Sequence, residues 1–311
     1  MTCPIPAPVL PAIHNIVFAT DFSESSLAAL PYIHRLTSWY GAAVHVVHVV
    51  RPEPSIELPL DFPVELDGDR NAALSEIKNM LGANPFGNVT TTSTVERGDL
   101  WGVMNGVIQE RGADLIVVGT RGRGGLGKIV MGSFAEQIYR QSRLPVLTVG
   151  PHCNENLPLR GSLRTVLFAT DFSLATERAL AWAASLCRFG AARLTLLHVI
   201  VPGPAAVPSS NVIDVLSDVG DELIAQGQEE ARGKLSALLA DPMLQGIDAG
   251  SRIEVGAPVD TILEVAADVR ADVIVMGARH SDDARLASHI PWSTASGVVR
   301  SAACPVLTVR S

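Results

Sequence analysis

The chain contains the same unit twice, and this duplication limits its possible folds more than any other feature of its 311 residues. The segment NIVFATDFSESSLAAL, beginning at Asn15, matches TVLFATDFSLATERAL, beginning at Thr165. Two later segments, ADLIVVGTR and LPVLTV, recur in the same order as ADVIVMGAR and CPVLTV. The copies lie 150 to 160 residues apart, which is much longer than the repeat of a solenoid. The sequence therefore predicts two tandem domains.

The segment GPHCNENLPLRGS between the copies is polar and contains proline and glycine, as linkers commonly do. We place the first domain at residues 12–150, the linker at 151–162 and the second domain at 163–311. Domains of this size can each bury a core of their own.

Within each copy, short apolar segments rich in β-branched residues alternate with helical segments. In the first copy the expected strands are IVFAT, AVHVVHVV, a segment ending at Glu96, LIVVG and PVLTV. Apolar strands that alternate with helices indicate a parallel sheet covered on both faces. We predict an α/β fold of two tandem Rossmann-like, doubly wound domains, each with five strands in the order 3-2-1-4-5. In such a sheet, ligands bind beyond the carboxyl ends of strands 1 and 4, where the strand order reverses.

Charge and composition exclude several classes of protein. The net charge of −8 gives no attraction to nucleic acid or to anionic lipid. No apolar run approaches the roughly 18 residues that a membrane span needs, and the N-terminus lacks the basic region of a signal peptide. The four cysteines form no C-x-x-C pair, which favours free thiols in a reducing compartment. The sequence predicts a cytoplasmic protein with no nucleic-acid or membrane partner.

The segment VVGTRGRGGLGKIVMGS, from Val117, fits three glycine patterns that could cradle phosphate. The dinucleotide pattern G-x-G-x-x-G belongs after the first strand of its unit, whereas here it follows the fourth. The P-loop pattern needs Ser or Thr after its lysine to hold Mg²⁺, whereas this chain has Ile129. Both patterns are rejected on these grounds.

The third pattern, G-x2-G-x9-G-S, fits its position. Gly119 and Gly122 would let the backbone approach a phosphate closely, while Gly132 and Ser133 open the helical segment SFAEQIYRQS. A helix N-terminus favours an anion, and Ser133 is a candidate to cap the helix or to bond a phosphate oxygen. After the first strand, Asp21 faces this segment across the expected crevice and is either a helix cap or a ligand-binding carboxylate.

These motifs resemble those of the universal stress protein (UspA-like) family. The resemblance rests on ATDFS after the first strand, HVV in the second, VVGTRGRGG…MGS after the fourth and a final PVLTV, and it covers both copies. It implies a tandem-domain member that binds ATP or a related adenine nucleotide, with or without Mg²⁺. Carried over position by position, it implies that the nucleotide contacts Ala19, Thr20, Asp21, Val49, Val118, Gly119, Arg121, Gly122, Gly132, Ser133, Phe134 and Ala135.

The second copy departs from the motif. It keeps Asp171 and Gly277, but His280 and Trp292 replace the second and third glycines. Asp282 and Asp283 lie where a triphosphate would favour cations, and like charges in a crevice are costly. We expect a degenerate second crevice and one nucleotide site in the chain.

Three classes of function follow. The first is a regulatory protein of the stress response whose bound nucleotide sets its conformation or assembly. The second is a slow ATPase or phosphotransferase, although no Mg²⁺-binding acid or base accompanies Asp21. The third is a tandem scaffold without a ligand. We expect the first, with no catalytic residue and no metal site. Since both copies end in PVLTV, at a sheet edge that invites pairing, we also expect an intramolecular pseudo-dimer of the two domains or a homodimer.

Overall fold

The computed structural model describes residues 10–50, 68–120, 132–153, 163–202, 213–278 and 294–310, without the side chains of 213–221. The chain divides into two compact units. The first domain comprises Ala12–Gly161. The second comprises the chain from Ser162 onward together with the N-terminal residues up to Pro11, whose carbonyl accepts a hydrogen bond of 2.6 Å from Ser185 Oγ.

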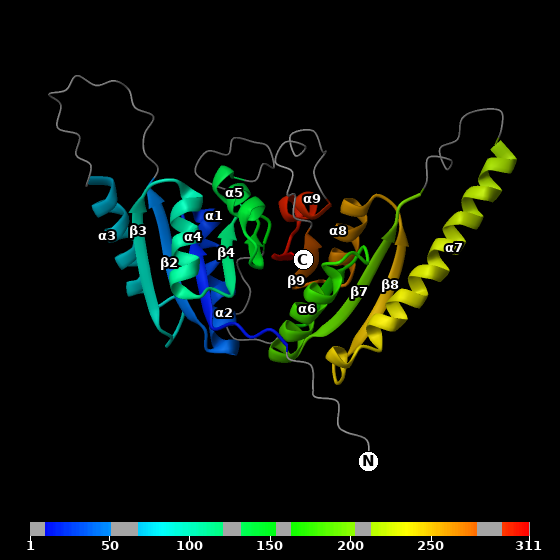
Figure 1. The fold of residues 1–311 in the computed structure, drawn as a ribbon, viewed down its shortest axis with the longest axis horizontal. Coiled ribbons are helices and arrows are strands. Elements are labelled where there is room, and N and C mark those ends of the chain that lie inside the picture. The colour runs from blue at the N-terminus through cyan, green and yellow to red at the C-terminus, as the bar shows by residue number, and fades with distance from the viewer. Residues whose placement is uncertain are drawn as a thin grey trace, which may run out of the picture. The chain divides into compact units, whose positions relative to one another are not determined.

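Strands and helices alternate through the first domain (Figure 1). Its elements are β1 (Asn15–Ala19), α1 (Glu24–Leu27), α2 (Leu30–Tyr40), β2 (Ala43–Val50), α3 (Gly68–Gly82), β3 (Thr91–Arg97), α4 (Leu100–Arg111), β4 (Leu115–Gly119), α5 (Ser133–Gln141) and β5 (Val146–Val149). The strand order is β3-β2-β1-β4-β5 with parallel pairings, as the sequence predicts.

The second domain repeats this arrangement. Its elements are β6 (Thr165–Ala169), α6 (Thr176–Gly190), β7 (Arg193–Ile200), α7 (Ile213–Leu239), the 3-10 helix η2 (Pro242–Leu244), β8 (Ala249–Val255), α8 (Pro258–Asp268), β9 (Val273–Ala278), α9 (Thr294–Ser301) and β10 (Val306–Arg310). The order β10-β9-β6-β7-β8 is that of the first sheet, and its pairings are again parallel. The α/β fold class, with two doubly wound domains, is confirmed.

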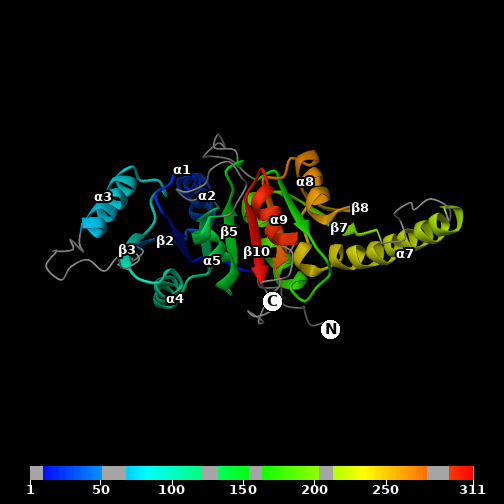
Figure 2. The ribbon, with the colours of Figure 1, turned by 90° about the horizontal axis from the view of Figure 1, so that it is seen from above.

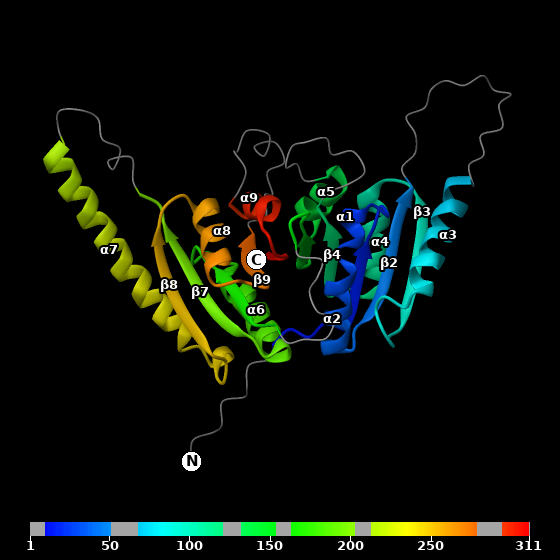
Figure 3. The ribbon, with the colours of Figure 1, turned by 180° about the vertical axis from the view of Figure 1, so that it is seen from behind.

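Each sheet is covered on both faces, as its apolar strands require. Helices α3 and α4 lie on opposite sides of the first sheet, and α7 and α8 lie on opposite sides of the second (Figure 2). The 27-residue α7 runs along β7 and β8 (Figure 3). The largest fully buried side chains include Phe18 in β1 and its counterpart Phe168 in β6. Within the described ranges, no helix is both long and apolar enough to cross a bilayer.

The helix after the first strand differs between the two domains. In the first domain the chain forms two helices, α1 and α2, which are separated at Ala28 and Ala29. Pro31 lies in the first turn of α2, and a proline lacks the N–H that a continuing helix would use. The second domain has Ala181 at the corresponding position and forms the single helix α6.

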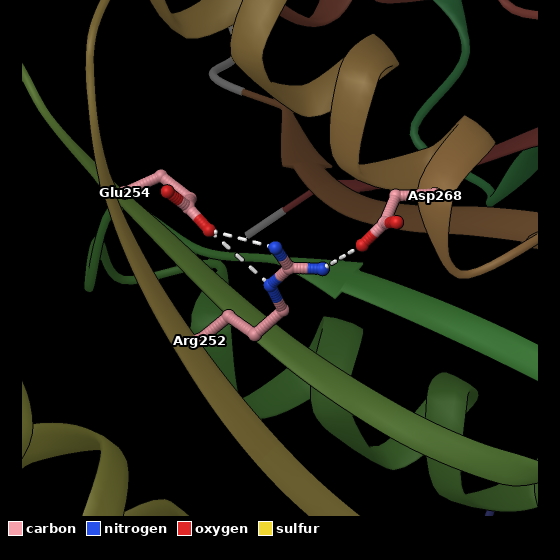
Figure 4. Close-up of polar contacts among 3 residues, drawn as sticks. All are labelled: Arg252, Glu254 and Asp268. Atoms are coloured by element: carbon pink, nitrogen blue, oxygen red, sulfur yellow. Dashed lines mark hydrogen bonds and ion pairs between the residues drawn. The ribbon is translucent and has the colours of Figure 1, made fainter.

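The sheets also differ in the polar contacts of their third strands. In the first domain the buried His45 ring contacts the hydroxyls of Thr92 and Thr94 on β3, and burial lowers the pKa of His45. In the second domain Arg252 of β8 bonds Glu254 at 3.0 and 3.2 Å and also pairs with Asp268 of α8 (Figure 4). Because these three side chains are partly or largely exposed, the ion pairs contribute little to stability.

Candidate functional site

A pocket lies at the carboxyl ends of β1 and β4, where the order of the first sheet reverses. It holds about 210 Å³ of space, open solvent included. The residues that line it come from β1 and the turn after it, from α1, from the end of β4 and from the start of α5: Ala19, Asp21, Ser26, Val118, Gly119, Gly132, Phe134 and Ala135.

The turn after β1 brings a carboxylate to this pocket. Ser23 is the N-cap of α1, since its hydroxyl accepts the Ser26 N–H at 3.2 Å. Asp21 is therefore not the cap. Its Oδ1 instead accepts hydrogen bonds from the Ser23 N–H at 3.0 Å and the Ser23 hydroxyl at 2.6 Å. A carboxylate has room for further donors beyond these two, so Asp21 can still accept a bond from a ligand in the pocket.

A hydroxyl pair fixes the start of α1 against the end of β1. Thr20 is fully buried, and its Oγ1 lies 2.7 Å from Ser26 Oγ and accepts the Phe22 N–H at 3.0 Å. Ser26 lines the pocket, although no sequence motif singles it out. A comparison of the two copies could have identified Ser26, because the second copy also has a hydroxyl residue, Thr176, at the matching position. The Thr176 Oγ1 lies 3.0 Å from Thr170 Oγ1.

Gly119 has a structural role that the glycine pattern did not reveal. A Cβ built at Gly119 would lie 2.4 Å from Ser25 O and 2.6 Å from Ser26 Cα, both backbone atoms of α1. The glycine thus lets α1 pack directly on the end of β4. Gly277 in the second domain has the same role, since a Cβ there would lie 2.9 Å from Ala175 Cβ. This packing explains why the second copy keeps this glycine although it has lost the other two.

The amino end of α5 forms the other wall. Gly132 is the N-cap, with φ −57° and ψ 142°, and its N–H donates to Thr120 O at 2.6 Å. Ser133 is the first residue of the helix and not its cap, so of its two alternative roles the bond to a phosphate oxygen is left. A glycine cap brings no side-chain acceptor to the first turn of the helix. The N–H groups and dipole of this end favour an anion in the pocket.

The structure brings seven of the twelve predicted site residues together around the pocket: Ala19, Asp21, Val118, Gly119, Gly132, Phe134 and Ala135. Thr20, Val49 and Ser133 are not among the lining residues. Thr20 acts behind the pocket wall through its hydroxyl contacts, and Val49 is buried in β2. Arg121 and Gly122 lie outside the described residues.

The corresponding turn of the second domain keeps the same backbone contacts. Asp171 Oδ1 accepts the Ser173 N–H at 3.0 Å, as Asp21 does with Ser23. Asp171 is exposed, however, whereas Asp21 is only partly exposed. The substitutions that mark the second copy, His280, Asp282, Asp283 and Trp292, lie outside the described residues. Among the described residues, no group of three His, Cys, Asp or Glu side chains forms a potential metal site.

The fold and the pocket define a class: a tandem pair of Rossmann-like α/β domains, with a crevice where the strand order of the first sheet reverses. The model of the universal stress protein family matches residues 12–150 and again residues 162–310. The chain belongs to this family.

Individual relatives support the same assignment. A universal stress protein of Methanocaldococcus jannaschii is 34% identical over 140 residues, covering 43% of this chain and 81% of that protein. A universal stress protein of Mycolicibacterium smegmatis is 24% identical over 314 residues, covering 96% and 97%. The crystal structure of a universal stress protein from Archaeoglobus fulgidus matches with a TM-score of 0.64 at 22% identity, covering 95% of this chain and 98% of that one. The last match shows the shared tandem fold.

Proposed function

We propose that the first domain binds one adenine nucleotide, ATP, and that the chain is a nucleotide-binding regulatory protein of the stress response. The observation that carries the proposal is the pocket where the strand order of the first sheet reverses. It combines a carboxylate acceptor, apolar walls and a helix N-terminus. The carboxylate can accept a hydrogen bond from a nucleoside hydroxyl or amine, the apolar walls suit a base, and the helix N-terminus suits a phosphate chain.

The described residues suggest a role for each wall. Asp21 would accept a hydrogen bond from the nucleoside, and Ala19 and Val118 would line its apolar side. The first turn of α5, from Gly132, would hold the phosphates through backbone N–H groups. The sequence motif alone adds Arg121 and Gly122 to the residues that would contact the nucleotide. Any Mg²⁺ would be bound by the phosphates of the nucleotide and not by a cluster of protein side chains.

The same lining favours a regulator over an enzyme. Efficient phosphoryl transfer uses an acid to hold Mg²⁺ and a residue to position the attacking group. Asp21 is the one acidic residue among the described residues that line the pocket, and the proposal already gives it to the nucleoside. The proposal includes a cytoplasmic location, which agrees with the buried free thiols of Cys153 and Cys187, because such thiols suit a reducing compartment.

Asp21→Asn tests the nucleotide site. Asparagine keeps an oxygen for the Ser23 donors but removes the charge and one acceptor, so the turn should persist while the ligand contact weakens. Loss of a buried hydrogen bond to a charged group costs about 1–3 kcal/mol, so we expect ATP affinity to fall roughly 5- to 150-fold. Calorimetric titration, with and without Mg²⁺, measures this effect and the stoichiometry, which should be one ATP per chain.

Asp171→Asn is the matched control, because Asp171 has the same contact with its own serine in the second domain. We expect it to leave ATP affinity unchanged. Two equivalent sites in the wild type, or a larger loss from Asp171→Asn than from Asp21→Asn, would place nucleotide in the second domain and contradict the proposal.

We also propose that the two domains associate through their last strands. Within its own domain, β5 ends the strand order of the first sheet, and β10 ends that of the second. Exposed edge strands favour pairing with another edge. Light scattering of the separately produced domains, alone and mixed, tests this expectation of an intramolecular pseudo-dimer. We expect homodimers or a mixed dimer, and domains that stay monomeric in every combination would refute it.

A further inference from the structure

The turn that carries Asp21 contains a phenylalanine in an unfavourable backbone conformation. Phe22 has φ 58°, in the left-handed region that is uncommon for bulky side chains. Such a conformation costs free energy and persists only where the surrounding contacts hold it. Since Phe22 directly follows Asp21, whatever holds Phe22 also fixes the direction in which the Asp21 carboxylate leaves the backbone.

His48, at the carboxyl end of β2, makes two contacts with this turn. Its ring stacks on the ring of Phe22, with centroids 4.5 Å apart and planes 27° from parallel. Its Nδ1 lies 2.8 Å from the carbonyl oxygen of Thr20. Because a carbonyl oxygen can only accept, Nδ1 must carry the proton and donate it. His48 therefore contacts the residue before Asp21 and the residue after it.

We propose that His48 is a positioning residue for the nucleotide site. By bonding Thr20 and stacking on Phe22, it holds the turn in the conformation that places Asp21 at the pocket. His48 is not among the residues that line the pocket, so it acts through the turn rather than by contact with the ligand. This inference rests on the proposed function, since it concerns the affinity of the same site.

The second domain offers a matched comparison. Phe172 has φ 56°, its ring lies 4.5 Å from that of His198, and His198 Nδ1 lies 2.9 Å from Thr170 O. Lys234 of α7 also lies over the Phe172 ring, with its Nζ 5.3 Å from the ring centroid. Replacing His198 thus removes the same kinds of contact from a domain whose glycine motif is altered.

The experiment compares ATP binding by the full chain and its variants His48→Ala, His48→Asn and His198→Ala. We expect His48→Ala to weaken ATP binding about tenfold, which corresponds to the loss of roughly one hydrogen-bonded contact. His48→Asn should recover most of the affinity, because an asparagine amide can donate to the Thr20 carbonyl as Nδ1 does. His198→Ala should bind ATP as the wild type does. Thermal unfolding of each variant identifies chains that fail to fold.

A second measurement does not depend on the nucleotide. In ¹⁵N NMR spectra of the ligand-free protein, the Phe22 amide should shift strongly in His48→Ala and return toward its wild-type position in His48→Asn. In the wild type, the ¹⁵N shifts of His48 should identify the tautomer protonated at Nδ1.

The outcomes separate the two proposals. ATP affinity that is unchanged in His48→Ala, or lowered equally in His48→Ala and His198→Ala, would overturn the positioning role. An unshifted Phe22 amide in His48→Ala would overturn it as well. A wild-type chain that binds no ATP, but whose Phe22 amide follows the expected pattern, would instead refute the proposed function and leave His48 as the residue that holds the turn.

Discussion

Gly132→Trp is expected to abolish ATP binding while the first domain stays folded. Gly132 lines the pocket as the N-cap of α5, and its φ of −57° is accessible to any residue, so a larger side chain strains no backbone angle. The indole would fill the space in front of the helix N-terminus. The second copy already has Trp292 at the corresponding position. We expect a loss of at least about 100-fold in affinity, or roughly 2.7 kcal/mol, measured by calorimetry.

Ala257→Trp provides the control for a tryptophan at a helix N-cap. Ala257 caps α8 in the second domain and is exposed, so this variant should bind ATP as the wild type does. Circular dichroism should show both variants folded. Ser293 follows Trp292 in the second copy as Ser133 follows Gly132 in the first. Binding that survives Gly132→Trp but is lost on replacing Ser293 would show that the nucleotide occupies the second domain.

Gly119→Ala is expected to destabilise the first domain by about 1–3 kcal/mol, as overpacking of a close contact does. The added Cβ would lie 2.4 Å from Ser25 O, a backbone atom that can move only if α1 moves. Displacing α1 would also shift Ser26 at the pocket wall and lower ATP affinity. Since a chain of two domains need not unfold in one step, hydrogen exchange of peptides from β4 should report the loss locally.

Gly277→Ala is the matched change in the second domain. Its Cβ would closely approach one side-chain atom, Ala175 Cβ at 2.9 Å, whereas the Cβ at Gly119 would meet backbone atoms. We therefore expect a smaller destabilisation there, seen in peptides from β9, with no change in ATP affinity. If peptides from β4 exchange hydrogen in Gly119→Ala as slowly as in the wild type, the packing of α1 on β4 does not depend on this glycine.

The order of the strands and the place of the pocket could be predicted from the sequence because both follow from regular patterns. Apolar segments that alternate with helices define a parallel doubly wound sheet, and such a sheet has its crevice where the strand order reverses. The spacing of glycines in a sequence, in contrast, does not predict which atoms pack against each glycine in the folded domain. The glycine pattern assigns Gly119 to phosphate approach, whereas the structure shows that α1 packs against it.

Other parts of the site depend on contacts between residues whose side chains carry no distinctive pattern. In the sequence, nothing distinguishes Ser26 from any other serine in a helix. The structure shows that its hydroxyl contacts Thr20 and that the residue lines the pocket. The choice between Gly132 and Ser133 as the cap of α5 depends on one backbone conformation, which the G-S pair leaves open. The position of His48 at the end of an apolar strand does not reveal its bond to Thr20 O or its stacking on Phe22.

The paired Phe–His turns bear on how the two halves of the chain could diverge. Each turn is contacted by the second strand of its own domain, through His48 or His198. A domain that folds without its ligand can lose the ligand without losing its structure. After a gene duplication, mutations in the loop of one copy would then escape the purifying selection that acts on folding. Such a copy is free to acquire a separate role while the other keeps the ancestral one.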